Sequence, residues 1–428
     1  MNGESSMGGV GVCRHNHSPE SLFRRRPAHE PSPASTQGRG GERGGSAPVG
    51  EASPAPPALA LVVYALCGHG RGHSSRAAAV AEALRARGHR VRFAADAPAA
   101  DRLAQEGGGP VHRVPALRQV LRGNRVRYLA TARANLDLTW RSPEIIAEAE
   151  AWLASVEADV VVSDHEPFVA RAARRLGVPV VALSHQLVLT EARPRVPLRH
   201  ALSAVGTRLG IGVLAPPRPD GVVVPSFFFP PPRAGSRAVF VPPILRDDVL
   251  AVRPEPGDRV LVYVNEGAGL EPLVRTLGAV DAAFDVYGLD PGQAAPPNVR
   301  LRPPSRAGFL ADLGAARAVV ATAGFTLLSE ALHLGVPVLA LPNRGFFEQV
   351  VNALALRDAG RGGAVVGRPP RPSDVAVFLD RAAGLRRPAQ TAAEGRAGRE
   401  RAADAIEAVV SGVGRPAPTR APVRPEVA

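Results

Sequence analysis

Short apolar runs alternate with segments of helical periodicity along most of this chain, and residues 321–353 show the pattern most clearly. The apolar run 318–321 has the length and β-branched content of a buried strand. The next segment repeats its leucines and alanines on one helical face, and Gly335 and Pro337 then end the helix. Because the run 336–341 predicts a second strand, these residues predict a strand–helix–strand unit of a parallel sheet.

The same rhythm recurs in both halves of the chain, which predicts an α/β protein with two doubly wound, Rossmann-like parallel sheets facing a central cleft. The predicted strands are residues 59–66, 90–94, 159–163, 179–183, 259–264, 284–287, 299–302, 318–321 and 336–341. A helix is expected to begin near Ser74, a suitable N-cap, and another to occupy about 390–410. Sheets of this kind bind ligands at the carboxyl ends of their strands.

The length of 428 residues exceeds a usual single core, so we expect two domains and tails. The expected parts are a disordered tail (1–57), a first domain (58–225), a linker (226–240), a second domain (241–388), a closing helix (389–412) and a disordered tail (413–428). Both tails are rich in proline, arginine and small residues. The linker contains three phenylalanines and then three prolines, which fit an apolar anchor with a stiff spacer or a buried strand that the prolines end.

The formal charge of +13 changes this picture little. The sequence holds no lysine, so all 52 basic residues are arginines, and it is rich in glycine, proline and alanine, which is typical of a G+C-rich genome. Because only 4% of the residues are aromatic and available for base stacking, we expect no nucleic acid as a partner. A basic face toward an anionic membrane stays open as an alternative.

Cysteine usage and the length of the apolar runs favour a cytoplasmic protein. Cys13 and Cys67 offer no disulfide framework, which fits a reducing compartment. No apolar run reaches the roughly 18 residues of a spanning helix, and the arginines at 24–26 precede no apolar stretch of the signal-peptide type. We therefore expect a cytoplasmic location, with peripheral contact at the inner face of the plasma membrane as a further option.

A glycine-rich turn follows the first predicted strand and ends at Gly72 and His73. Its glycines are spaced G-x-G-x-G, which differs from the dinucleotide fingerprint, so the turn alone is a weak signal. His73 stands at the start of a helix, where the helix dipole disfavours a protonated imidazole. It is therefore a candidate catalytic base, and a histidine that caps the turn is the alternative.

Polar residues also follow the strands at 159–163 and 179–183. Asp164 follows the first of them, and His185 follows the second. Because neighbouring parallel strands end at the same edge of a sheet, Asp164 is a candidate partner of His73, and a helix cap is the alternative. His185 is a further candidate at the same edge.

In the second half, the small-residue turn at Ala323 and Gly324 precedes a helix, and a helix N-terminus binds phosphate through its backbone amides. Glu330 lies one and a half turns into that helix, and Glu348 begins the next one, so two carboxylates are available for ribose hydroxyls. This arrangement suits a ribose diphosphate. Arg246, near the expected domain boundary, suits the same diphosphate, and a surface arginine is the alternative.

The spacing of these residues resembles the GT-B glycosyltransferases, most closely the MurG-like enzymes related to the N-acetylglucosaminyltransferase of lipid II synthesis. The resemblance spans about 58–412 and rests on an ordered set: Gly324, Ser329, Glu330, Gly335, Val336, Pro337, Glu348, Gln349, Asn352 and Ala353. Three positions depart from the family pattern. Glu348-Gln349 replaces Gln-Gln or Asp-Gln, Val264-Asn265-Glu266 replaces a Gly-Gly-Ser turn, and the segment that ends at Arg246 replaces Asn-Pro-x-Arg.

The resemblance implies a role for each candidate residue. The expected catalytic residues are His73 and Asp164. The expected donor-binding residues are Gly72, Arg246, Asn265, Ala323, Gly324, Phe325, Thr326, Glu330, Glu348 and Gln349. Within that set, the turn 323–326 and Arg246 would bind the diphosphate, Glu330 would hold the ribose, and the pair at 348–349 would contact the donor sugar.

The predicted function is transfer of a hexose-type sugar from a nucleoside-diphosphate sugar, with UDP favoured, to an acceptor hydroxyl, and the resemblance implies inversion at the anomeric carbon. No Asp-x-Asp motif follows a predicted strand, so we expect neither a metal in the donor site nor a cofactor. The acceptor stays open between a lipid-linked sugar, a cell-wall polymer and a small metabolite. The alternatives are a nucleotide-sugar epimerase of the same architecture and a non-catalytic nucleotide-sugar-binding protein, and a nucleic-acid binder fits least.

Overall fold

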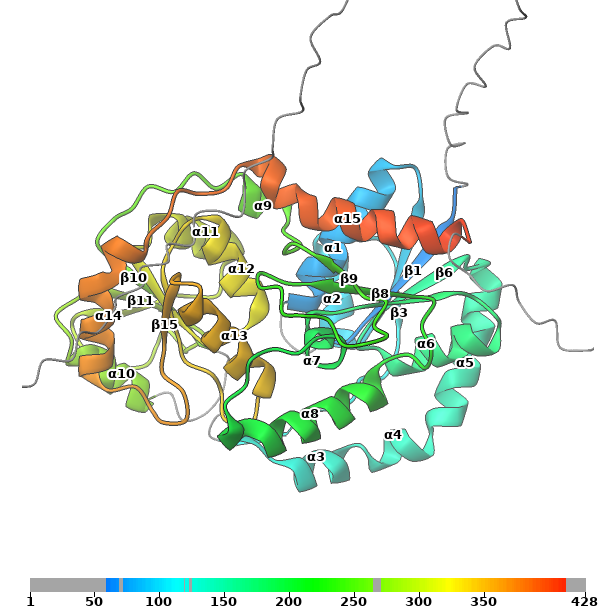
Figure 1. Ribbon diagram of the computed structural model, residues 1–428, viewed down its shortest axis with the longest axis horizontal. Coiled ribbons are helices and arrows are strands. Elements are labelled where there is room, and N and C mark those ends of the chain that lie inside the picture. Colours follow the sequence, from blue (N-terminus) through cyan, green and yellow to red (C-terminus); the bar gives the residue numbers. More distant parts are fainter. Residues whose placement is uncertain (1–58, 69–71, 119, 123–124, 265–270, 413–428) are drawn as a thin grey trace, which may run out of the picture. The chain divides into compact units, whose positions relative to one another are not determined.

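The computed structural model describes residues 59–68, 72–118, 120–122, 125–264 and 271–412 (Figure 1). The tails predicted at 1–57 and 413–428 lie outside the described residues, and so does Asn265. Within the described residues, each of the nine predicted strands is present, and the ends of each strand lie within two residues of the predicted ends.

The first sheet has seven strands, all parallel, in the order β3-β2-β1-β6-β7-β8-β9. Its strands are β1 (Leu61–Leu66), β2 (Arg90–Ala95), β3 (Val111–Arg113), β6 (Val160–Asp164), β7 (Val180–Leu183), β8 (Gly221–Pro225) and β9 (Val239–Val241). Strand β1 lies between β2 and β6, and Leu66 pairs with Asp164. The register therefore places Asp164 at the carboxyl edge of the sheet, beside the end of β1.

Both faces of this sheet are covered, as the continuous apolar strands predict. Alternate residues of β1 point to opposite sides: Val62 and Tyr64 belong to one buried cluster, and Val63 and Ala65 belong to another. The helices of this half are α1 (Gly72–Ala86), α2 (Ala97–Gln105), α3 (Tyr128–Ala134), α4 (Leu136–Trp140), α5 (Ser142–Val156), α6 (Pro167–Arg175), α7 (Val188–Glu191) and α8 (Ala201–Leu214). Helices α1 and α2 cover the first side, and α5 and α6 cover the second. A short hairpin, β4 (Leu121–Arg122) and β5 (Arg125–Val126), precedes α3.

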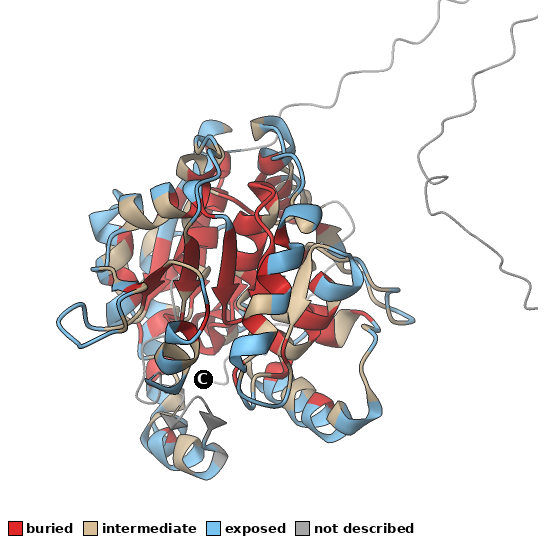
Figure 2. Cartoon of the chain, turned by 90° about the vertical axis from the view of Figure 1, so that its left-hand side faces the viewer, coloured by how far each residue is buried: buried red, intermediate tan, exposed pale blue. Residues whose placement is uncertain are grey.

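The second sheet has six parallel strands in the order β12-β11-β10-β13-β14-β15. They are β10 (Val260–Tyr263), β11 (Phe284–Tyr287), β12 (Val299–Leu301), β13 (Ala318–Ala321), β14 (Val338–Ala340) and β15 (Gly362–Ala364). Its helices are α9 (Asp247–Leu250), α10 (Glu271–Gly278), α11 (Arg306–Ala315), α12 (Phe325–His333), α13 (Phe347–Asp358) and α14 (Pro372–Leu385). Figure 2 shows buried strands in the middle of this half and helices around them whose outer faces are exposed. This is the second doubly wound sheet that the sequence predicts.

Helix α15 (Ala392–Val410) follows the second sheet in the chain but packs on the first one (Figure 1). Ala402, Ala403, Ile406 and Val409 belong to the buried cluster of β1 and α1. The predicted closing helix therefore completes the hydrophobic core of the first half, and by doing so it ties the two halves together.

Two local predictions are wrong, and one alternative is excluded. The predicted linker 226–240 overlaps β9, which hydrogen-bonds to β8 and belongs to the first sheet. The three phenylalanines at 227–229 are not a strand. Helix α1 begins at Gly72, two residues before the predicted N-cap, so Ser74 is a buried residue inside the helix.

Gly335 ends α12 as predicted. Its φ is +72°, in the left-handed region that favours glycine, and a Cβ there would lie 1.9 Å from the carbonyl oxygen of Arg387. No other residue fits this position, so the helix stop and the start of the strand that follows depend on this glycine.

Candidate active site

His73, Arg76 and Asp164 form a hydrogen-bonded group at the carboxyl edge of the first sheet. Asp164 is the last residue of β6, and α1 carries His73 and Arg76 one turn apart above it. His73 Nδ1 lies 3.0 Å from Asp164 Oδ1. The Arg76 guanidinium donates from Nη2 to Oδ1 at 2.8 Å and to Oδ2 at 2.6 Å, and from Nε to Oδ2 at 3.0 Å. The sequence predicted that His73 and Asp164 would meet, and the structure brings them together.

Asp164 is fully buried and yet ionised. Burial by itself would raise the pKa of its carboxyl group, but Arg76 and His73 hold that pKa well below its usual range. The carboxylate can only accept, so a proton on Nδ1 of His73 is donated to Asp164. Nδ1 also lies 3.1 Å from Arg76 Nη2. In the neutral tautomer with its proton on Nδ1, the second ring nitrogen, Nε2, carries the lone pair that can accept a proton.

Arg76 is a site residue that the sequence did not single out. It follows His73 by three positions, a spacing that places both side chains on one face of a helix. That signal was present, but an arginine on a helix is unremarkable in a chain with 52 basic residues. Arg76 is 5% exposed, as is Arg399 among the described arginines, so it is the set of three hydrogen bonds to the buried Asp164 that distinguishes Arg76.

Glu166, two residues after Asp164, is the helix cap at this edge. Its carboxylate accepts hydrogen bonds from the backbone N–H groups of Phe168 (3.0 Å) and Val169 (2.7 Å) at the start of α6. Burial raises the pKa of Glu166 to about 7, although these amides lower it. The alternative role for Asp164, a helix cap, therefore belongs to Glu166.

The predicted phosphate turn precedes α12 in the second half. Gly324 is the N-cap and has no side chain to cap the first amides of the helix, and a Cβ on Gly324 would meet nothing within 4 Å. A Cβ on Gly72 would lie 2.5 Å from Thr326 Oγ1. The start of α1 and the start of α12 are therefore in contact, and a side chain larger than that of glycine at position 72 would require Thr326 to move.

His185 links the same turn to the first sheet. Its ring stacks on Phe325 with 3.8 Å between the ring centroids, and one ring nitrogen lies 2.8 Å from Asn352 Oδ1. Asn352 Nδ2 in turn donates to the carbonyl oxygen of Ala323 at 3.1 Å. The backbone of the turn is therefore held by α13 on one side and by the end of β7 on the other, and His185 supports it.

The pair predicted to contact the donor sugar points in two directions. Gln349 Oε1 is buried and accepts a hydrogen bond from the backbone N–H of Asn343 at 2.8 Å, which fixes the loop before α13. Glu348 is half-buried, and its charge acts on Arg76 and His185 and favours the protonated form of each. Glu348 is therefore the member of the pair that faces the His73 group.

Glu330 and Arg246 lie within electrostatic reach of each other. Burial raises the pKa of Glu330 to about 7, and the Arg246 charge opposes this rise while Asp248 adds to it. The Arg246 side chain is 14% exposed and lies 3.4 Å from Glu106 Oε2 and 3.6 Å from Asp248 Oδ1. Glu106 follows α2, so Arg246 already bridges the two halves through an ion pair.

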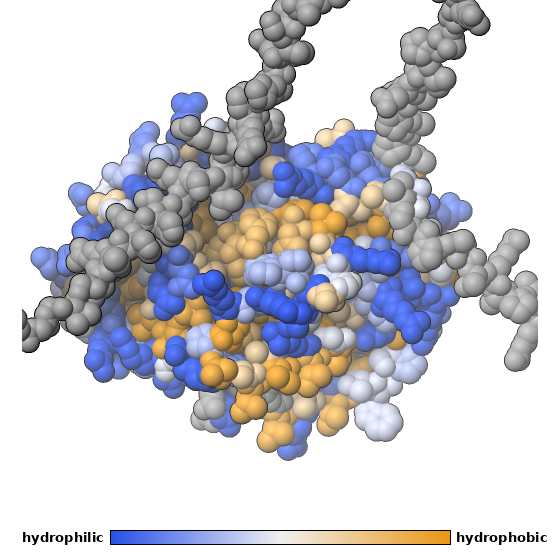
Figure 3. Space-filling model, in the orientation of Figure 1, coloured by the Kyte–Doolittle hydropathy of each residue, from blue (hydrophilic) through white to orange (hydrophobic). Residues whose placement is uncertain are grey.

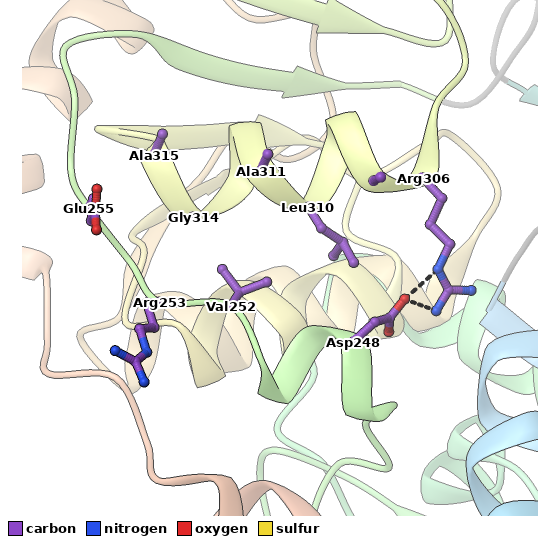
Figure 4. A pocket seen from close by; sticks show the side chains of 10 residues that line it. Asp248, Val252, Arg253, Glu255, Arg306, Leu310, Ala311, Gly314 and Ala315 are labelled. Carbon is purple, nitrogen blue, oxygen red and sulfur yellow. Dashed lines mark hydrogen bonds and ion pairs between the residues drawn. The ribbon is translucent and has the colours of Figure 1, made fainter.

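A surface depression of about 700 Å³ lies beside α11 (Figure 4). Val252 and Leu310 point into it from facing segments, and the ion pair between Arg306 and Asp248 lies at one end. None of the residues that line it is a predicted site residue. The group formed by His73, Arg76 and Asp164 and the turn before α12 are therefore elsewhere, where the two sheets present their carboxyl edges.

The model of the family described as glycosyl transferase family 1 matches residues 60–382, which is most of the chain. The chain belongs to glycosyl transferase family 1. The family match favours sugar transfer over the two alternatives, the epimerase and the non-catalytic binding protein.

Relatives and solved structures agree with this assignment. An uncharacterised glycosyltransferase from Methanosarcina mazei is 24% identical over 332 residues, which cover 70% of this chain and 84% of that one. The kitacinnamycin glycotransferase structure has a TM-score of 0.56 and 21% identity, covering 82% of this chain and 99% of that one. MurG from Acinetobacter baumannii has a TM-score of 0.52 and 18% identity, covering 81% and 99%. These likenesses confirm the GT-B fold, so the protein is a glycosyltransferase with two facing Rossmann-like domains.

In the part of the chain that the structure describes, no helix combines the length and the apolar character that crossing a bilayer requires.

Replacing Glu330 with glutamine should change how stability depends on pH. Unfolding lowers the pKa of Glu330 from about 7 toward the ordinary value of 4.5, so between these values the folded protein holds a proton that the unfolded chain releases. The protonated Glu330 makes its full contribution to the free energy of unfolding below pH 4.5. This contribution is lost as the pH rises through 7, and it amounts to about 1.4 kcal/mol for each unit of pKa difference. In urea unfolding, the free energy of unfolding of Glu330→Gln should therefore rise relative to that of the wild type between pH 5 and pH 8. If the free energies of unfolding of the variant and the wild type differ by the same amount at pH 5 and at pH 8, the raised pKa of Glu330 is contradicted.

Proposed function

We propose that this enzyme transfers a hexose-type sugar from a nucleoside-diphosphate sugar, with UDP as the favoured nucleotide, to an acceptor hydroxyl, with inversion at the anomeric carbon. The observation that carries the proposal is the contact between Gly72 and Thr326. It brings the start of α1, which holds His73, against the start of α12, where a diphosphate would bind. A base and a leaving-group site on facing domains are what a direct displacement requires.

His73 is the proposed general base. Its Nε2 accepts the proton of the acceptor hydroxyl as the oxygen attacks the anomeric carbon, and the Asp164 carboxylate stabilises the imidazolium that forms. Arg76 holds that carboxylate in place with three hydrogen bonds. One sugar–oxygen bond forms and one breaks, and the nucleoside diphosphate leaves with the electron pair.

The donor lies on the second domain in this proposal. The uncapped amides at the start of α12, with Ala323, Gly324, Phe325 and Thr326, bind the diphosphate and stabilise the charge that develops on it. Arg246 adds a cation once it exchanges Glu106 for a phosphate oxygen.

The sugars of the donor contact carboxylates. Glu330 binds the ribose hydroxyls, and Glu348 binds the hexose near His73, while Gln349 shapes the loop beside it. Asn265 completes the donor site in the sequence-based proposal, and it lies outside the described residues.

The proposed reaction needs no metal and no cofactor. The helix N-terminus and Arg246 supply the positive charge that a divalent cation gives to other nucleotide-sugar sites. The sequence supports metal independence, because no Asp-x-Asp motif follows a predicted strand.

Removing the proposed base should slow transfer and spare donor binding. His73→Ala should lower turnover by roughly 10²–10⁴-fold, because a positioned general base contributes about that much, and it should leave the affinity for the nucleotide nearly unchanged. His112→Ala is the matched control, because His112 stacks on Trp152 at the edge of the first sheet, away from this site. Unchanged turnover in His73→Ala would rule out the base assignment. Asp164 is a poorer target, because its removal leaves Arg76 as an unpaired buried charge.

Nucleotide preference can be measured without knowing the acceptor. UDP, GDP, dTDP and ADP are added to the full chain in EDTA and in Mg²⁺, and thermal unfolding is followed. A ligand at about a hundred times its dissociation constant stabilises the folded state by about 2.7 kcal/mol, so UDP should raise the unfolding temperature by several degrees in both buffers. A stronger response to another nucleotide would overturn the UDP preference. A response only in Mg²⁺ would overturn metal independence.

The first domain, which binds the acceptor in this proposal, carries a feature that supports peripheral membrane contact. Leu198, Leu202 and Leu209 follow one face of α8 and the turn before it, and they are 91%, 90% and 69% exposed. Figure 3 shows apolar atoms gathered along the lower edge of the molecule, where Figure 1 draws α8. Residues 192–219 contain five arginines and no acid. We propose that this face rests on an anionic lipid surface and that the acceptor is lipid-linked.

A carboxylate placed on the apolar face of α8 should weaken this contact. Leu202→Asp should lower co-sedimentation with phosphatidylglycerol vesicles and leave the unfolding temperature unchanged, because Leu202 contributes almost nothing to the core. Val377→Asp is the matched control, since Val377 is 57% exposed on α14 of the other domain. Equal sedimentation of both variants and the wild type would contradict the membrane face.

A further inference from the structure

His165 is a buried imidazole beside the proposed base. It follows Asp164 at the carboxyl end of β6, and 7% of its surface is exposed. Both ring nitrogens are buried, and neither has a hydrogen-bond partner in the described part of the chain. Buried polar side-chain atoms nearly always have a partner in folded proteins, so this imidazole calls for a ligand that is not part of the chain.

The backbone at His165 adds a second, independent observation. Its φ is +59°, a left-handed conformation that non-glycine residues adopt at a cost. Among the described residues only Glu157 and Arg218 share this feature, and both are exposed. Strain at a buried residue with an unsatisfied side chain is typical of functional sites.

The chemistry of His165 suits a hydroxyl group. Burial lowers the pKa of His165 to about 4, against a weaker opposing effect of Asp164, so the ring is neutral near pH 7. A neutral imidazole offers one N–H donor and one lone pair, which is what a hydroxyl needs in return. The ring meets the His73 ring edge-on, with 6.2 Å between the centroids. The two imidazoles are therefore neighbours at the carboxyl end of β6.

The surroundings of His165 belong to the acceptor side of the enzyme. The charged groups that act on it are Asp164, His73 and Arg76, all from the first domain. The groups proposed for the nucleotide, Arg246 and Glu330, act on each other.

We propose that His165 binds the acceptor by hydrogen-bonding a hydroxyl next to the one that His73 deprotonates, so that the acceptor presents two neighbouring hydroxyls, as a sugar or polyol does. This inference rests on the proposed function, because it takes His73 as the base. It extends that function by naming the chemistry of the acceptor and the residue that selects it.

The variant that tests the inference is His165→Phe, which keeps an aromatic ring and removes both nitrogens. If His165 has no partner in the free enzyme, His165→Phe should unfold at the same temperature as the wild type or higher. His165→Asn is the control for backbone strain, because asparagine tolerates the left-handed region and should also be at least as stable. A lower unfolding temperature for both variants would show that the imidazole is already satisfied within the protein, and it would overturn the inference.

Binding is tested with two matched probes, trans-1,2-cyclohexanediol and cyclohexanol, on enzyme that carries ¹⁵N-labelled histidine. The ring signal of His165 is identified by its loss in His165→Phe. The diol should shift this signal at concentrations where cyclohexanol does not, and no shift with either probe would overturn the inference.

Turnover separates this inference from the proposed function. The wild type should transfer sugar to the diol faster than to cyclohexanol, and His165→Phe should raise KM for the diol about tenfold, as the loss of a net hydrogen bond predicts. If the wild type transfers nothing while the diol still shifts the His165 signal, the failure lies with the proposed transfer. If transfer proceeds and the variant keeps the wild-type preference for the diol, the failure lies with His165.

Discussion

The buried ion pair between Asp164 and Arg76 is the interaction on which the rest of this site depends. A carboxylate at the end of β6, without contact to water, persists only because a guanidinium satisfies both of its oxygens. The same pair fixes α1 above the edge of the sheet and gives Nδ1 of His73 its acceptor. Losing one partner would leave the other charge buried and would cost about 3–5 kcal/mol. The pair is therefore structural and chemical at once: it sets where His73 lies, and it supplies an acceptor for a proton on Nδ1.

The second constraint is the contact between the two domains at the start of α12. Thr326 meets Gly72, Phe325 stacks on His185, and the backbone of the turn is held by Asn352. The proposed phosphate site therefore takes its shape from both domains, although all of its own backbone belongs to the second. Helix α15 supports this arrangement from the other side, because the chain returns from the second sheet to complete the core of the first.

Several polar groups in this region lack the partners that would stabilise them fully in the free protein. Glu330 is buried with a pKa of about 7, and His165 is buried with two unpaired nitrogens and a strained backbone. Arg246 is paired with Glu106, a partner that it would exchange for phosphate. Groups of this kind reduce stability, and in the proposed function they gain partners when substrate binds, which would give the site specificity through hydrogen bonding.

Local patterns in the sequence determined the nine predicted strands, the helix stop at Gly335 and the candidates His73 and Asp164, because apolar periodicity and strand-end polarity are properties of neighbouring residues. The GT-B fold was predicted from the resemblance to a known family. The sequence did not determine Arg76, the inward turn of Gln349, the strand β9 inside the expected linker or the return of α15 to the first sheet. Each of these is decided by a partner far away in the chain: Asp164 for Arg76, β8 for β9, and β1 and α1 for α15. Such pairings depend on which surfaces are buried together, and only the tertiary structure fixes that.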